Sequence, residues 1–158
     1  MVGATGLVGN YLMNVLAEDA YYDRVLLLTR RPVELPEMVE KVEHVFTDFE
    51  HLDSLDLPGV THVFCCLGTT IKKAGSQAAF RKVDFEYVVA LARTGRRAGA
   101  RHMSLVSSVG ADAKSANFYL RVKGEAEEEL NGVGFDELHI FRPSVLLGRR
   151  SEERPGER

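Results

Sequence analysis

A tyrosine and a lysine four residues apart, Tyr119 and Lys123, have the types and the spacing needed for proton transfer. The residues around them show a helical pattern, and side chains four apart lie on one face of a helix. An ammonium group beside a phenol stabilises the phenolate, so the phenol becomes a better proton donor. The other interpretation is that Tyr119 packs against the edge of a sheet while Lys123 is a solvated helix residue.

Two serines, Ser107 and Ser108, follow a predicted strand and come shortly before this pair in the sequence. A hydroxyl group at the end of a strand can donate a hydrogen bond to an oxyanion that develops on a carbonyl oxygen. Because a Tyr-x-x-x-Lys spacing also arises by chance, the serines strengthen the interpretation considerably. Together these side chains offer a proton donor and a hydrogen-bond donor to an oxygen that becomes negative.

Three glycines near the start, Gly3, Gly6 and Gly9, have the spacing G-x-x-G-x-x-G and open a predicted amphipathic helix over Leu7–Glu18. The first glycine permits a tight turn, the second lets backbone amides approach a pyrophosphate, and the third lets helix and strand pack closely. The positive end of the helix then faces the anion. The spacing predicts a dinucleotide-binding turn, although glycines also occur wherever chains turn.

Two arginines, Arg30 and Arg31, stand at the end of the predicted strand Arg24–Thr29, where dinucleotide sites discriminate NAD from NADP. A site for NAD usually carries a carboxylate there, yet no acidic residue follows until Glu34. A guanidinium group can bind a phosphate through two hydrogen bonds. The sequence therefore favours NADP, and the alternative is that both arginines are solvated loop residues.

The ends of the next two strands give weaker signals. Asp48 could flank the adenine, or it could cap a short helix that begins near Glu50. Gly68 would let the backbone approach a cofactor at the carboxyl edge of the sheet. Cys65 and Cys66 point to opposite faces of their strand, and both are interpreted as small core residues rather than as nucleophiles.

Short apolar segments alternate with segments of helical periodicity, which predicts an α/β fold with a Rossmann-type doubly wound parallel sheet and helices on both faces. The predicted strands are Arg24–Thr29, Val42–Phe46, Thr61–Leu67, Arg101–Ser107 and Glu137–Arg142. The predicted helices are Leu7–Glu18, Val83–Ala98 and Phe118–Asn131, and the predicted loops are Arg31–Glu40 and Thr69–Gln77. A single NAD(P)-binding domain accounts for residues 1–158.

Both ends of the sequence are short for such a domain. Only Met1 and Val2 precede Gly3, although a glycine turn of this kind normally follows a buried strand of about five residues. The sequence ends at Arg158, soon after the last predicted strand, where a substrate-binding segment usually follows. We expect part of the first strand and the C-terminal substrate segment to lie outside these residues.

Composition narrows the classes of ligand. The 158 residues are 45% hydrophobic and 27% charged, with a net charge of −3, so a small molecule or a protein partner is expected rather than a nucleic acid. The two adjacent cysteines exclude a disulfide framework and are too few for a zinc cage, so no metal is expected. No apolar stretch reaches the roughly 18 residues of a membrane span, and a basic secretory signal is lacking. These features predict a cytoplasmic protein.

At this point the chain resembles the short-chain dehydrogenase/reductase superfamily, and more closely its atypical branch, which contains the Tat-interacting protein oxidoreductases. The likeness extends from Gly3 to Gly156. Beyond the glycine turn it rests on the segments Phe64–Thr70, Lys73–Gly75, Val83-Asp84, Ser107-Ser108, Gly110–Asp112, Tyr119–Glu125, Phe141–Pro143 and Arg154–Glu157.

The resemblance implies that Tyr119 is the proton donor, that Lys123 holds the nicotinamide ribose, and that Ser107 or Ser108 binds the substrate carbonyl. With the motifs above, the expected NADP-binding residues are Gly3, Thr5, Gly6, Leu7, Val8, Gly9, Arg30, Arg31, Asp48, Leu67, Gly68, Thr69, Tyr119, Lys123, Pro143, Leu146 and Arg154. One departure concerns the helix before the serine strand, where many members carry an asparagine and Val83–Ala98 has none. The proton relay to solvent must differ, or catalysis is weak.

Three functions follow from these patterns. The first is an NADP-dependent oxidoreductase acting on a small carbonyl or alcohol. The second is an NADPH-sensing regulatory module that binds partner proteins with little or no catalysis, which the resemblance permits. The third is an aspartate-semialdehyde dehydrogenase, which Gly3–Gly9 also suits, but such enzymes need a separate catalytic domain for which this chain has no room. Fold analogy alone does not choose among them.

Overall fold

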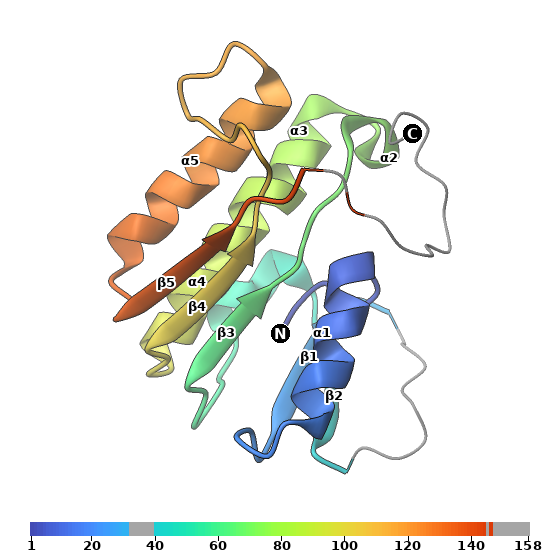
Figure 1. Cartoon of the computed structure of the whole chain (residues 1–158), viewed down its shortest axis with the longest axis vertical. Helices are drawn as coiled ribbons and strands as arrows, with labels where there is room; N and C mark the ends of the chain where they lie inside the picture. The colour runs from blue at the N-terminus through green and yellow to red at the C-terminus, as the bar shows by residue number, and fades with distance from the viewer. Residues whose placement is uncertain (32–39, 145, 147–158) are drawn as a thin grey trace.

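The computed structural model describes residues 1–31, 40–144 and 146, and these form parallel strands with helices on both sides (Figure 1). The strands are β1 (Val25–Thr29), β2 (Val42–Phe46), β3 (His62–Cys65), β4 (His102–Val106) and β5 (Glu137–Phe141). β1 pairs with β2, and β3, β4 and β5 pair in that order, all in parallel. The predicted α/β class and Rossmann-type sheet are confirmed.

Val2 joins the two parts of the sheet. It forms parallel bridges to Leu28 of β1 and to Cys65 of β3. Its N–H donates to the carbonyl of Phe64 at 3.0 Å, and its own carbonyl accepts from the N–H of Cys66 at 3.1 Å. The spatial order is therefore β2, β1, Val2, β3, β4, β5, which is the Rossmann order with Val2 in the place of the central strand. We call this connection the seam.

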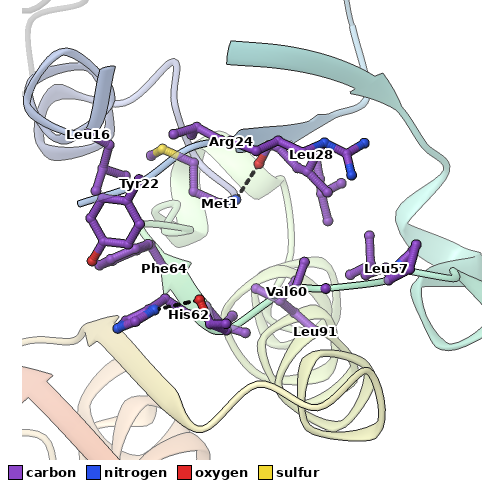
Figure 2. Close-up of a pocket in the computed structure, with 16 residues that line it drawn as sticks. Met1, Leu16, Tyr22, Arg24, Leu28, Leu57, Val60, His62, Phe64 and Leu91 are labelled. Carbon is purple, nitrogen blue, oxygen red and sulfur yellow. Dashed lines mark hydrogen bonds between the residues drawn. The ribbon is translucent and has the colours of Figure 1, made fainter. Parts of the chain in front are cut away.

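A cavity of about 100 Å³ lies in the seam between β1 and β3. Figure 2 shows Leu16 and Tyr22 on one side of it, Leu57 and Leu91 on the other, and Met1 at one end. Apolar side chains line both sides of this space. Exposed residues at its rim, among them Arg24, Pro58 and Thr61, leave it open to solvent.

Helices cover both faces of the sheet. They are α1 (Leu7–Glu18), the 3₁₀ helix η1 (Phe49–Ser54), α2 (Ile71–Ala74), α3 (Gln77–Arg81), the π turn η2 (Lys82–Glu86), α4 (Tyr87–Arg97) and α5 (Phe118–Val133). In Figure 1, α1 lies over one face near β1, while α4 and α5 lie behind the other face. No helix within the described ranges is long and apolar enough to span a membrane.

Two layers of apolar side chains follow from this arrangement. Val25 and Leu27 of β1 pack in a cluster with Leu16 of α1. Val63 of β3 packs in the larger cluster with Leu91 of α4. Strand residues that alternate in this way between two covered faces explain the nearly continuous apolar runs in the sequence.

The helical segment before β4 begins earlier than the sequence predicts. The prediction was Val83–Ala98, whereas α3, η2 and α4 form one run from Gln77 to Arg97. The hydroxyl group of Ser76 accepts from the N–H of Ala79 and caps its start. The first two turns carry little apolar periodicity, so only the cap signalled them.

The predicted loop Thr69–Gln77 is also partly wrong, because it contains α2. The hydroxyl group of Thr70 accepts from the N–H of Lys73, and Gly75 ends the turn with a φ of 89°. A helix of this length is too short to display a 3.6-residue pattern. Similarly, α5 continues to Val133, two residues beyond its predicted end, and stops at the left-handed residue Gly134. The predicted loop Arg31–Glu40 lies largely outside the described residues.

Candidate functional site

A cleft of about 550 Å³ opens at the carboxyl ends of the strands, where open α/β sheets bind their ligands. Residues from the glycine turn, from the ends of β3 and β4, and from α5 line it. The predicted site residues that line it are Thr5, Gly6, Leu7, Val8, Leu67, Gly68, Thr69, Ser107, Tyr119, Lys123, Pro143 and Leu146. We call this space the central cleft. Asn10, Tyr11, Cys66, Lys73 and Val106 also line it.

Close backbone packing explains two glycines of the turn. Gly3 has a φ of 81°, and a Cβ atom there would lie 2.4 Å from the carbonyl oxygen of Cys66. A Cβ atom on Gly9 would lie 2.0 Å from the carbonyl oxygen of Gly3. The lack of a side chain at Gly3 therefore lets the turn pack against the end of β3, and the lack of one at Gly9 lets α1 pack against the turn.

Gly6 faces the central cleft at the start of α1. It is the N-cap residue, and its own N–H donates to the carbonyl of Gly3 at 3.0 Å. Gly6 offers no side chain to bond the first N–H groups of α1. Backbone N–H groups and the positive end of the helix dipole at this position suit an anion such as a pyrophosphate.

Replacing Gly9 with alanine should lower both stability and dinucleotide affinity. The added methyl group meets backbone rather than a flexible side chain, so the start of α1 must move away from Gly3. Overpacking of this kind costs about 1–3 kcal/mol. Chemical denaturation measures the stability change, and calorimetric titration with NADPH measures the affinity.

Gly132→Ala is the matched control, because Gly132 lies in α5 and a Cβ atom there meets nothing within 4 Å. This change should be neutral or stabilise the protein by about 0.5–1 kcal/mol, as expected for alanine in a helix. If Gly9→Ala proved as stable as its parent, the close packing of α1 on the turn would be wrong.

The structure separates the two serines. Ser107 directly follows β4, its N–H donates to the carbonyl of Phe141 at 2.7 Å, and it lines the central cleft. Its buried hydroxyl oxygen has no hydrogen-bond partner among the described residues. The hydroxyl group of Ser108 instead donates to the carbonyl of Val109 at 3.3 Å. Ser107 is thus the serine whose hydroxyl group remains available to a ligand in the cleft.

Tyr119 and Lys123 come from the first turns of α5. Asn117 caps that helix by accepting from the N–H of Leu120 at 3.2 Å. The ring of Tyr119 packs against the ring of Phe80, with their centroids 5.3 Å apart. Lys123 is 5% exposed, so the interpretation of a solvated helix lysine is wrong.

The buried ammonium group of Lys123 has a carboxylate partner that the sequence analysis did not assign. Its Nζ lies 2.7 Å from Oδ1 of Asp84 on η2. Oδ2 of Asp84 accepts from the N–H of Thr69 at 3.0 Å. Asp84 lies on the same stripe as the buried residues Val88 and Leu91, and a carboxylate within an apolar stripe is the signal that could have revealed it.

The arginines stand apart from the lining of the central cleft. Arg30 directly follows β1 and is exposed, and its guanidinium group lies 5.4 Å from the ring centroid of Phe49. Arg31 is also exposed, and its carbonyl accepts from the hydroxyl group of Thr29 at 2.7 Å. Both follow the carboxyl end of β1 and so lie on the cleft edge of the sheet. Their contact with a 2′-phosphate stays a prediction, and Arg154 lies outside the described residues.

The capping interpretation of Asp48 matches what the structure contains. Its Oδ1 accepts from the N–H of Glu50 at 3.0 Å at the start of η1. This hydrogen bond lowers the pKa of Asp48, with a smaller contribution from His51. A contact between Asp48 and an adenine stays a prediction.

Neither cysteine is suited to act as a nucleophile. Burial raises the pKa of Cys65 to about 12 and the pKa of Cys66 to about 11. Both thiols are therefore protonated at neutral pH, whereas a nucleophilic cysteine must form a thiolate. This protonation weighs against the cysteine chemistry of an aspartate-semialdehyde dehydrogenase.

Comparison with known proteins now adds to this geometry. Residues 3–154 match a family described as NAD(P)H-binding. The chain belongs to that family. It is 40% identical over 160 residues to protein HTATIP2 of Rattus norvegicus. That alignment covers 99% of this chain and 66% of the relative. It is also 35% identical over 153 residues to protein FMP52, mitochondrial, of Debaryomyces hansenii. That alignment covers 96% of this chain and 68% of the relative.

Among solved structures, the NAD(P)H-binding chain resembles the oxidoreductase ylbE from Lactococcus lactis. The TM-score is 0.65 at 22% identity, and the match covers 99% of this chain and 73% of that chain. The family match and the two relatives HTATIP2 and FMP52 confirm the resemblance to the atypical short-chain dehydrogenases/reductases, and the solved structure agrees in fold. The chain spans about two thirds of the length of the curated relatives it matches.

The predicted cytoplasmic localisation is contradicted by these relatives. FMP52 proteins from several fungi are named as mitochondrial. The prediction rested on the cysteine content and on the lack of a secretory signal. Neither observation separates the cytosol from other compartments inside a cell.

The residues of the central cleft fit an NAD(P) cofactor. The positions of Gly3 and Gly9 tolerate no side chain, and the start of α1, from Gly6 to Val8, lines the cleft. The hydroxyl group of Ser107 and the ammonium group of Lys123 supply donors on the far side. Backbone amides for phosphates and hydroxyl or ammonium donors for a ribose match the polar groups of a dinucleotide.

Proposed function

We propose that the protein is an NADP-dependent oxidoreductase that interconverts a small carbonyl compound and its alcohol. The observation that carries the proposal is the buried Lys123 ammonium group, which shares one cleft with Tyr119, Ser107 and the glycine turn. A buried lysine costs desolvation energy, so a site that retains one needs its charge. Proton transfer beside a bound dinucleotide uses such a charge directly.

The side chains divide the chemistry as follows. The dinucleotide, when bound, supplies or accepts the hydride. Tyr119 gives a proton to the carbonyl oxygen of the substrate, or takes one from the hydroxyl group of the alcohol. Lys123 stabilises the phenolate that forms in reduction, and it offers a donor to the nicotinamide ribose. Ser107 donates a hydrogen bond to the oxygen that becomes negative.

Cofactor preference rests on the two arginines. An exposed guanidinium group at the end of β1 meets no carboxylate from its immediate neighbours in the described sequence, since Thr29 and Arg31 flank Arg30. A 2′-phosphate would form charge-assisted hydrogen bonds there, whereas a 2′-hydroxyl group would not. The position therefore favours NADPH over NADH.

Calorimetric titration of the full-length protein with NADPH and with NADH tests the proposal, followed by a panel of aldehydes and ketones. We expect NADPH to bind at least about tenfold more tightly, since one charge-assisted contact contributes about 1.5–3 kcal/mol. We also expect NADPH to be oxidised in the presence of at least one carbonyl compound. Equal affinities would remove the NADP assignment, and failure of both nucleotides to bind would remove the function.

A regulatory role through protein partners is the second candidate, and one surface feature favours it. Tyr11 and Val15, four residues apart on α1, are 62% and 60% exposed. Tyr11 also lines the central cleft, so a bound dinucleotide could alter this surface. Contiguous exposed apolar surface marks contacts with other proteins, and these two side chains lie one turn apart on the same helix. Tight NADPH binding without turnover of any carbonyl compound would favour this role over catalysis.

A further inference from the structure

The helix that faces α5 contains a π turn where it passes the central cleft. In η2, the N–H of Tyr87 donates to the carbonyl of Lys82, five residues earlier, instead of four. Regular α-helix precedes it in α3 and follows it in α4. π turns are rare and occur frequently at functional sites, because the wider turn changes the direction of its side chains. Asp84 lies within this one.

Both carboxylate oxygens of Asp84 contact residues that line the central cleft. Oδ1 lies 2.7 Å from Nζ of Lys123, and Oδ2 accepts from the N–H of Thr69 at 3.0 Å. The side chain of Asp84 is 0% exposed and that of Lys123 is 6% exposed. A Cβ atom on Gly68 would lie 3.8 Å from each of the two charged atoms. Gly68, which also lines the cleft, thus lies beside the ion pair without a side chain of its own.

Stability alone does not account for such a pair. Burying two charges costs desolvation energy that their attraction often fails to exceed, so apolar residues would pack the same space at least as well. The pair instead fixes a positive charge at one point beside the cleft. Among the surrounding titratable groups, Cys65 on β3 is protonated at neutral pH because burial raises its pKa to about 12. Tyr119 on α5 and Lys73 line the same cleft.

We propose that Asp84 is a positioning residue that holds Lys123 protonated and in place for Tyr119 and the dinucleotide. The inference rests on the proposed function, in which the ammonium group of Lys123 serves Tyr119 and the dinucleotide. Without the carboxylate, a buried ammonium group loses its counter-charge and gives up its proton at a lower pH. The site would then lose its positive charge at a lower pH than the parent does.

Asp84→Asn is the decisive variant, because the amide keeps the size of the side chain and can still accept from Thr69. Lys123 should lose its proton at a lower pH than in the parent. NMR titration of lysine side chains in the cofactor-free protein measures this, with the Lys123 signal assigned by its absence in Lys123→Met. This measurement does not depend on catalysis.

Activity and binding supply the second measurement. At a pH one unit above the point at which its Lys123 titrates, the Asp84→Asn variant should have lost about tenfold or more in kcat/KM and in NADPH affinity, and it should recover most of both at a pH one to two units below that point. A purely structural defect would give a loss that does not vary with pH. Thermal unfolding should confirm that the variant is folded at both pH values.

Glu127→Gln is the matched control. Glu127 is a second buried carboxylate, on α5 itself, and it pairs with Arg142 at the end of β5. Its removal should lower stability without changing the pH at which Lys123 titrates. If Asp84→Asn left the Lys123 titration unchanged, or gave a loss independent of pH, the proposal would be overturned. A parent protein that never turns over a carbonyl would overturn the proposed function alone, while a shifted titration would still support the role of Asp84.

Discussion

Tyr119→Phe lowers the turnover of a carbonyl substrate by about 10²-fold or more, the usual scale for a lost general acid, while NADPH affinity stays close to that of the parent. The change removes one oxygen atom. The ring remains packed against Phe80, with which its centroid distance is 5.3 Å, so α5 and the central cleft keep their shape. Steady-state oxidation of NADPH, followed by its absorbance, measures the turnover, and calorimetry measures the affinity.

Two comparisons make this result specific. Tyr87→Phe removes a hydroxyl group that donates to Glu50 and that lies outside the cleft lining, so turnover should be retained. Lys123→Ala should reduce turnover and affinity together, because its ammonium group serves both the phenol and the ribose. Undiminished turnover in Tyr119→Phe would remove Tyr119 as the proton donor, and the proposed mechanism with it.

Arg30→Ala combined with Arg31→Ala weakens NADPH binding by about 10²- to 10⁴-fold and leaves NADH binding nearly unchanged. Each charge-assisted contact with the 2′-phosphate contributes about 1.5–3 kcal/mol, and NADH has no phosphate at that position. Both side chains are exposed, so the double variant should fold as stably as its parent. Paired calorimetric titrations at one salt concentration measure the two affinities.

The control for this experiment removes two positive charges elsewhere. Arg93 and Arg101 are 65% and 69% exposed and form surface ion pairs with Glu129 and Asp136. Such pairs contribute little to stability, and neither arginine lines the central cleft. Their double alanine variant should retain the preference for NADPH. Equal losses of NADPH and NADH in the Arg30 and Arg31 variant would show that these residues do not read the 2′-phosphate.

Local patterns predicted the parts of the site that depend on local backbone. The spacing of Gly3 and Gly9 predicted a turn in which backbone segments pack closely, and both positions do meet backbone atoms. The alternation of strands and helices predicted the parallel sheet. The four-residue spacing of Tyr119 and Lys123 places both on one face of α5, and both line the cleft. In each case the residues that must meet are near one another in the sequence.

Contacts between distant segments could not be predicted in this way. Asp84 meets Lys123 because the π turn directs it across the space between η2 and α5, and no periodicity signals a π turn. The sequence also could not distinguish Ser107 from Ser108. In the structure the hydroxyl group of Ser108 donates to the carbonyl of Val109, whereas that of Ser107 has no hydrogen-bond partner among the described residues. The compartment was predicted wrongly because composition carries little information about it.

The seam has a consequence for how the protein responds to its ligand. Arg30 follows β1 on one side of Val2, whereas Ser107 and Lys123 belong to the other side, and the hydrogen bonds of Met1 and Val2 connect the two. A ligand that contacts residues on both sides of Val2 would hold the two parts of the sheet together. At a hundred times its dissociation constant, such a ligand adds about 2.7 kcal/mol to the free energy of unfolding. The supply of the dinucleotide would then govern how long each copy of the protein survives before proteolysis.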